Sequence, residues 1–273
     1  MLALVLGRRL PGWAYMWTLA VAIYAAVKWL SWWRGRKVPH SAARSLAFLF
    51  LWPGMDAEAF LDGRTVVPPP SASAWVLGGL KTALGAALLW IGVRLVPPQH
   101  PFLRGWAGML GLIFLLHFGS FDLLARAWQA AGICAEPIMR SPIRSQSLGE
   151  FWGKRWNLGF RQLSHDFLFR PALPKLGLAG ATMLVFLASG IIHDLVISVP
   201  ARAGYGLPTA YFLLQGLAAL AERSATVRML GLQSGLRGWL WTVLVTAGPA
   251  YLLFHPWFVA RVILPFLVAI HAL

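Results

Sequence analysis

The chain has 273 residues, of which 58% are hydrophobic and only 12% are charged. Soluble domains carry about 25% charged residues, so this composition argues against a soluble enzyme and excludes a disordered chain or a coiled coil. The formal net charge is +15. We find no basic-aromatic nucleic-acid-binding motif and expect no nucleic-acid partner, because basic loops of membrane proteins meet an anionic leaflet.

Apolar segments punctuated by proline, glycine and charge recur along the whole chain. We predict membrane helices at about 13–33, 74–96, 105–125, 177–199, 206–221, 238–254 and 257–272. The shorter apolar run 46–52 stops at Pro53-Gly54, which predicts an interfacial or re-entrant piece. The sequence therefore predicts an all-α, polytopic transmembrane bundle of about seven spans. We expect residues 1–273 to form a single integral membrane domain.

The basic residues gather in alternate loops. The loops 34–73, 126–175 and 222–237 together hold 16 of the 24 lysine and arginine residues. The positive-inside rule places this side in the cytosol and the amino terminus outside, although Arg8 and Arg9 run against that orientation. The charge pattern suits a bacterial inner membrane or an ER-type membrane.

The longest polar stretch, 126–175, is too long for an ordinary connection. Ser147-Leu-Gly-Glu150 has the spacing of a helix capping box. On a helix that continues from there, four polar residues fall within about 60° of one another. They are Glu150, Lys154, Asn157 and Arg161, and Trp152 and Trp156 lie on another face. Periodicity alone favours a plain interfacial amphipathic helix over a functional one.

The predicted fourth span contains two adjacent ionisable residues, His193 and Asp194. Such residues are costly in hydrocarbon and normally face a cavity or a partner. Histidine titrates near physiological pH, so His193 is a candidate to take a proton from an alcohol. Ser189 and Gly190 lie within one helical turn and leave space beside the ring. The alternative is a structural histidine that bonds a neighbouring helix.

Several other kinds of site find no support. Cys134 is the only cysteine, so an intrachain disulfide and a cysteine zinc cluster are excluded, and we expect no metal site. The sequence has no P-loop, no His-Glu-x-x-His, no Gly-x-Ser-x-Gly and no dinucleotide fingerprint. Nucleotide-driven transport and serine hydrolysis therefore lack support.

Two motifs resemble the wax synthase branch of the membrane-bound O-acyltransferase family. Residues 147–157 read Ser-Leu-Gly-Glu-Phe-Trp-Gly-Lys-Arg-Trp-Asn, which is similar to that branch's Ser-Leu-x-x-Phe-Trp-x-Arg-Arg-Trp-Asn signature. Residues 188–194, Ala-Ser-Gly-Ile-Ile-His-Asp, resemble its later Ser-Gly-x-x-His motif. Weaker similarities lie at Leu51-Trp-Pro-Gly-Met55, at Tyr211-Phe-Leu-Leu-Gln-Gly216 with Glu222, and at Leu253-Phe-His-Pro256.

The resemblance implies acyl transfer from acyl-CoA to the hydroxyl of a lipophilic alcohol, with no further cofactor. Carried over, the catalytic residues are His193 as general base and Asn157 as its partner at the acyl carbonyl. The substrate-binding residues implied are Trp152, Lys154, Arg155, Trp156, Arg161 and Ser189. Lys154 stands where the plant enzymes commonly have arginine, which keeps the charge and removes a bidentate contact. The chain is also shorter than many family members.

Other functions stay open at this stage. The same chemistry can serve a sterol, a glycan or a secondary-metabolite hydroxyl, because acceptor choice depends on the shape of the tunnel. A proton-coupled transporter would also explain intramembrane His193, Asp194 and His117. It predicts paired repeats or broken helices in matching halves, and the sequence has neither. The sequence does not give the oligomeric state.

Overall fold

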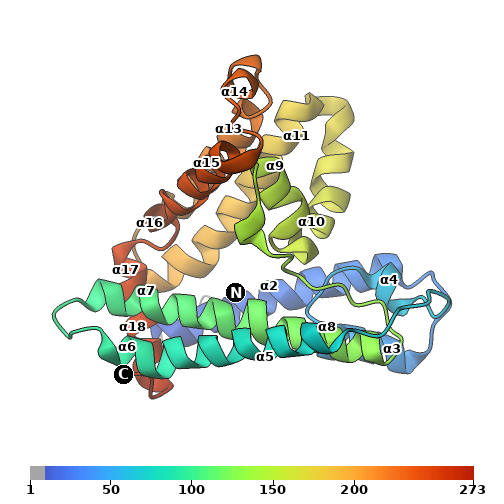
Figure 1. Cartoon of the computed structure of the whole chain (residues 1–273), viewed down its shortest axis with the longest axis horizontal. Helices are drawn as coiled ribbons and strands as arrows, with labels where there is room; N and C mark the ends of the chain where they lie inside the picture. The colour runs from blue at the N-terminus through green and yellow to red at the C-terminus, as the bar shows by residue number, and fades with distance from the viewer. Residues whose placement is uncertain (1–9) are drawn as a thin grey trace. The chain divides into compact units, whose positions relative to one another are not determined.

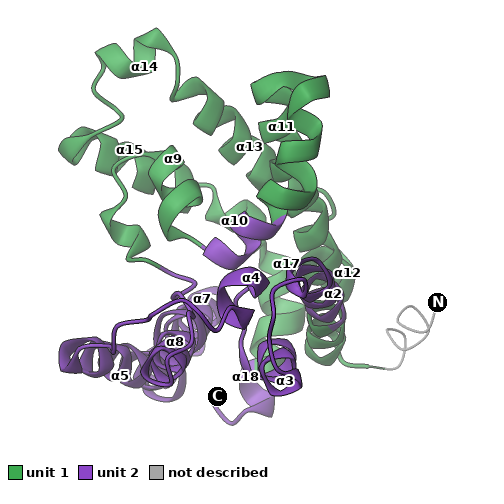
Figure 2. Ribbon diagram, turned by 90° about the vertical axis from the view of Figure 1, so that its right-hand side faces the viewer, with its two compact units in different colours: residues 1–21, 140–156, 164–266 green, residues 22–139, 157–163, 267–273 purple. Residues whose placement is uncertain are grey.

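The computed structural model describes residues 10–273, so Arg8 and Arg9 lie outside the described part. Residues 10–273 contain helices and connections and no β-strand, which confirms the expected all-α class. By contacts the chain divides into two compact units (Figure 2). Among the described residues, unit 1 takes 10–21, Arg140–Trp156 and Ser164–Phe266. Unit 2 takes Ala22–Met139, Asn157–Leu163 and Leu267–Leu273. The expected single functional domain stays a prediction.

The early part of unit 2 is built on the second half of α2 (Gly12–Gly35). The expected short apolar piece is α3 (Ala42–Leu51), followed by a turn at 52–55 and α4 (Ala57–Leu61). Lys28 on α2 is 2% exposed; it donates to the carbonyl of Gly54 and lies 3.2 Å from the ring centre of Phe48. A buried lysine thus holds the turn after Trp52 against α2.

Two long helices follow in unit 2 and pack against each other (Figure 1). The first comprises α5 (Ala72–Ala87), a π-helical stretch (Leu88–Gly92) and α6 (Val93–Leu95), and the second comprises α7 (Pro101–Leu112), a π-helical stretch (Ile113–Ser120) and α8 (Phe121–Ala130). A Cβ on Gly111 would lie 2.9 Å from the backbone nitrogen of Leu89. Gly111, in the third predicted span, thus allows the two helices to approach closely.

Unit 1 is centred on α11 (Arg170–His193) and α13 (Leu207–Ala221), which pack together. Short α10 (Leu158–Ser164) and a π-helical stretch (His165–Phe169) precede α11. Gly177 within α11 has φ 63° and ψ −178°, so the straight span begins there, near the predicted residue 177. A π-helical stretch (Asp194–Ser198) and α12 (Val199–Ala201) continue the helix beyond His193. The later helices are α14 (Ala225–Met229), α15 (Gly235–Ala247), α16 (Ala250–Leu253), α17 (Pro256–Phe258), a π-helical stretch (Val259–Ile263) and α18 (Leu264–Ala269).

The described residues contain four helices long and apolar enough to cross a membrane, as expected of an integral membrane protein. These are Gly12–Gly35, Ala72–Leu95, Pro101–Ala130 and Leu158–Ala201. The number rises to five if Gly235–Leu253 and Pro256–Ala269, bent by 57°, form one broken span. The expected seven spans are therefore not confirmed. The predicted fifth span is α13, whose 15 residues reach only about 22 Å of the roughly 30 Å hydrocarbon core.

Candidate functional site

The predicted helix start at Ser147 is present. The side-chain oxygen of Ser147 accepts from the backbone N–H of Glu150 at 3.0 Å, and α9 (Leu148–Glu150) begins there. The second half of the capping box differs, because the Glu150 carboxylate accepts from the backbone N–H of Gln146 at 2.8 Å. A π-helical stretch (Phe151–Arg155) continues the segment as far as Trp156.

The expected continuous helix through residues 150–161 is wrong. Trp156 has an extended ψ of 127°, and Asn157 has φ 41°, so the chain turns before α10 begins. Asparagine is among the few residue types that adopt left-handed geometry readily. The predicted polar stripe of Glu150, Lys154, Asn157 and Arg161 therefore does not exist as one helix face.

The side chain of Asn157, in unit 2, starts the next helix. Its Oδ1 accepts from the backbone N–H of Phe160 at 3.2 Å, which is the bond of an N-cap residue. The backbone N–H of Asn157 donates to the sulfur of Met139 at 3.2 Å. Since Oδ1 serves the cap, the Nδ2 amide is the part of this side chain suited to donate to a ligand.

The turn that Lys28 holds packs against the helix that Asn157 caps. A Cβ on Gly159 would lie 3.4 Å from the backbone nitrogen of Met55. The Leu51–Met55 motif thus supports the segment that follows Asn157, and both belong to unit 2. Arg161 is an exposed residue of the same short helix.

Trp152 packs on α13 in unit 1. Its ring lies 5.7 Å from that of Phe186 on α11 and 5.9 Å from that of Phe212 on α13. Its indole N–H donates to Oε1 of Gln215 at 3.4 Å, and the Gln215 amide donates to the carbonyl of Val245 at 2.7 Å. Gln215 is fully buried, so this polar chain fixes the orientation of the indole.

His193 is the last residue of α11, and its ring contacts the same face of α13. The ring centres of His193 and Phe212 are 4.4 Å apart. Nδ1 lies 2.7 Å from the carbonyl oxygen of Ser189, and a carbonyl can only accept. The neutral imidazole therefore carries its proton on Nδ1 and its lone pair on Nε2, as a general base requires. Ser189 is buried and contributes its main-chain oxygen.

A carboxylate holds the motif segment at the other end of α13. Glu222, 5% exposed, accepts from the backbone N–H groups of Leu148 at 2.7 Å and Gly149 at 3.0 Å. These donors belong to the first turn of the motif, which has no helical partner for them. One end of α13 thus binds the start of the segment that carries Trp152.

The basic residues of the motif differ in their surroundings. Lys154 is exposed. The guanidinium of Arg155 lies 2.6 Å from Oε1 of Glu150 and donates to the carbonyl of Arg140 at 3.1 Å. The backbone N–H of Gln146, together with Arg155, lowers the pKa of Glu150. Arg155 therefore stabilises the fold of the motif segment, whether or not it also binds a substrate.

Within unit 1 the structure brings Trp152 and His193 into contact with the same ring, that of Phe212. Trp156 stacks on Phe151 at 5.4 Å, and the ring of Phe151 lies 5.0 Å from that of Trp152. Asn157 and Arg161 belong to unit 2, so the pairing of Asn157 with His193 stays a prediction.

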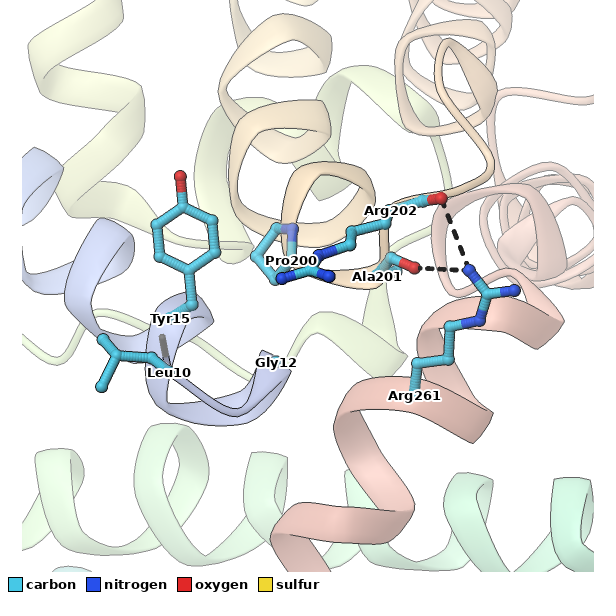
Figure 3. Close-up of a pocket in the computed structure, with 7 residues that line it drawn as sticks. All are labelled: Leu10, Gly12, Tyr15, Pro200, Ala201, Arg202 and Arg261. Atoms are coloured by element: carbon cyan, nitrogen blue, oxygen red, sulfur yellow. Dashed lines mark hydrogen bonds between the residues drawn. The ribbon is translucent and has the colours of Figure 1, made fainter. Parts of the chain in front are cut away.

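A cavity of about 390 Å³ lies elsewhere in unit 1 (Figure 3). It is lined by Leu10, Gly12, Tyr15, Pro200, Ala201, Arg202 and Arg261. The guanidinium of Arg261 donates to the carbonyls of Ala201 at 3.1 Å and Arg202 at 3.4 Å, and thereby caps α12. The lining includes none of the predicted site residues, and we do not assign this cavity to the chemistry.

Sequence reasoning missed the functions of α13. No role was assigned from the sequence to three residues that lie only within the weaker similarities: Phe212, Gln215 and Glu222. Asp194 was noted only as the neighbour of His193. A glutamine in the middle of an apolar helix is a signal, because a buried amide needs partners. The sequence could not show that the partners are Trp152 and the backbone of residue 245.

Comparisons with known proteins find a family match over the part of the chain that carries these residues. Residues 135–214 match the model of the membrane bound O-acyl transferase family. This match includes the motif segment, Asn157, His193 and most of α13, and it confirms the resemblance expected from the two motifs.

Individual relatives carry related activities in their names. A probable long-chain-alcohol O-fatty-acyltransferase 2 of Arabidopsis thaliana is 36% identical over 96 residues, which are 32% of this chain and 28% of the relative. A long-chain-alcohol O-fatty-acyltransferase of Simmondsia chinensis is 28% identical over 131 residues, covering 42% of this chain and 37% of the relative. An acyl-CoA–sterol O-acyltransferase 1 of Arabidopsis thaliana is 28% identical over 95 residues, covering 32% and 28%. The matched stretches thus span well under half of these relatives.

Proposed function

We propose that this chain, whose residues 135–214 resemble the membrane bound O-acyl transferase family, is an O-acyltransferase. It transfers an acyl group from acyl-CoA to the hydroxyl of a lipophilic alcohol and forms an ester. The observation that carries the proposal is the Nδ1 contact of His193 with the Ser189 carbonyl, which leaves Nε2 as a base within an apolar helix.

The reaction needs one proton to leave the alcohol and one to reach the sulfur. In our proposal Nε2 of His193 takes the hydroxyl proton as the oxygen attacks the thioester carbonyl. The C–S bond then breaks, and the imidazolium returns the proton to the departing thiolate. Such general base catalysis contributes typically 10²–10⁴-fold.

Asn157 has the second role in the proposal. Because its Oδ1 is used by the Phe160 N–H, its Nδ2 amide is the group that donates to the acyl carbonyl oxygen as negative charge develops. Exposed Lys154 is the motif cation that we assign to the phosphates of the donor. We place this segment on the cytosolic side, because the basic loops predict that orientation.

We assign the ring of Trp152 to the wall of the acyl-chain site. Its contacts with Phe186 and Phe212 form an apolar surface beside His193. A long-chain alcohol is the first candidate acceptor, since two of the relatives described above are named for it. A sterol is the second, because another relative is named for a sterol acceptor.

The experiment compares wild type with His193→Ala in purified membranes supplied with acyl-CoA. Release of free thiol and formation of lipid ester are measured with a long-chain alcohol and with a sterol. His165→Ala is the matched control, since His165 is an exposed histidine of unit 1 that pairs with Asp166 at 3.2 Å. We expect ester from wild type and His165→Ala and at least a 10²-fold loss in His193→Ala. Full turnover by folded His193→Ala would remove the histidine from the chemistry.

A further inference from the structure

The residue after His193 binds a different set of groups from the histidine itself. Oδ1 of Asp194 accepts from the hydroxyl of Ser198 at 2.8 Å and from the backbone N–H of Gly206 at 2.9 Å. Oδ2 accepts from the backbone N–H of Thr209 at 3.1 Å and from the Thr209 hydroxyl. Four donors from three parts of unit 1 therefore converge on one carboxylate.

Two of those donors are backbone groups at the start of α13. Gly206 has φ 83° and immediately precedes the helix, and Thr209 lies in its first turn. The backbone N–H groups of a first turn have no helical partner and carry partial positive charge. Asp194 thus does for α13 what an N-cap side chain does, although it belongs to the segment that continues α11.

The same contact fixes where α13 passes His193. Thr209 and Phe212 are three residues apart on α13, so they lie on one face. Asp194 binds the first of them and His193 contacts the second, at 4.4 Å between ring centres. A Cβ on Gly190 would lie 2.7 Å from the Cα of Thr209, so the two segments already approach as closely as their backbones allow.

We infer that Asp194 is a positioning residue of the acyl-transfer site: its carboxylate holds α13 so that Phe212 fixes the ring of His193. This inference rests on the proposed function. Asp194 acts on the reacting groups through the position of α13. Its partner Ser198 also lies beside a second histidine. The Ser198 hydroxyl lies 3.4 Å from Nε2 of His255, which is fully buried and whose Nδ1 accepts from the N–H of Phe258.

The test separates positioning from folding by measuring kcat per folded molecule. The variants are Asp194→Asn and Thr209→Val, together with wild type and His193→Ala. Asp194→Asn replaces an acceptor oxygen with a donor that faces the N–H groups of α13, and Thr209→Val removes one hydroxyl donor. Thr182→Val is the matched control, because its hydroxyl donates to the carbonyl of Leu178 in its own helix and its side chain is only partly buried.

We expect kcat of Asp194→Asn to fall about 10- to 100-fold, with the KM for acyl-CoA within about twofold, because a shift near 1 Å can cost 10²-fold. Thr209→Val should show a smaller fall in kcat, and Thr182→Val none. A merely structural role would lower the yield of folded protein and leave kcat per folded molecule unchanged.

An unchanged kcat in folded Asp194→Asn overturns the inference. The proposed function is still supported in that case if His193→Ala loses ester formation. If Asp194→Asn does not fold, Thr209→Val decides: a lower kcat at constant KM supports the inference, and an unchanged kcat overturns it. If wild type forms no ester with either acceptor, the proposed function fails and the inference falls with it.

Discussion

The approach of α11 and α13 beside His193 makes Gly190→Ala a sharp test of the packing. Gly190 is buried, and the added methyl would lie 2.7 Å from the Cα of Thr209 and 3.2 Å from its Cβ and Cγ2. Carbon atoms at rest are about 3.5–4.0 Å apart. The nearest atom is backbone, so a side-chain rotation cannot relieve the clash and α13 must move by about 1 Å.

Overpacking of this kind costs about 1–3 kcal/mol. For chains of 150–250 residues, each kcal/mol shifts the melting temperature by about 2–4 °C, so we expect Gly190→Ala to melt about 2–12 °C below wild type. If the site is the one proposed, a displacement near 1 Å also lowers ester formation by up to about 10²-fold.

The assay is a thermal melt of the detergent-purified protein followed by tryptophan fluorescence, with ester formation measured in parallel. Gly79→Ala is the control, because it adds the same methyl in helix α5 where no atom lies within 4 Å. Alanine in a helix interior gains roughly 0.5–1 kcal/mol over glycine, so this variant should melt at or above wild type. A Gly190→Ala protein as stable as wild type would refute the close approach described here.

Three further substitutions probe the motif segment. Glu222→Ala leaves two backbone N–H groups without their acceptor, which costs about 1–3 kcal/mol each. Thermal melts should therefore show a lower midpoint than wild type. An unchanged midpoint would contradict the role of Glu222 in holding the motif segment. Because the folded pKa of Glu150 is lowered, its stabilisation is present above the unfolded value near 4.3 and disappears as pH falls through the folded one. Midpoints of wild type and Glu150→Gln should therefore converge as the pH falls below the folded pKa of Glu150; a constant gap would exclude this linkage. Lys154→Ala should raise the KM for acyl-CoA while kcat stays constant, and unchanged steady-state kinetics would remove Lys154 from donor binding.

Local signals in the sequence were sufficient for part of this architecture. The helix start at Ser147 depends on residues three positions apart, and the structure has it. The span that contains His193 was predicted to begin at 177, where Gly177 breaks the helix. Both features depend on neighbours in the chain, which is why pattern and spacing identify them.

The features that the sequence did not reveal depend on distant partners or on one dihedral angle. The prediction of a helix through residues 150–161 assumed helical backbone angles at every position. Asn157, with φ 41°, does not have them. The amide of Gln215 bonds partners 63 and 30 residues away, and no local pattern encodes that pairing.

The dihedral angle of Asn157 restricts which residues can replace it during evolution. The position requires left-handed geometry, an acceptor for the Phe160 N–H and, in the proposed reaction, a donor for an oxyanion. Glycine supplies only the first property, and an ionised aspartate supplies the first two. Alanine supplies none of them readily. Substitution by aspartate should thus keep the shape of this turn and lose the donor, which makes Asn157 a position where architecture and chemistry select the same amino acid.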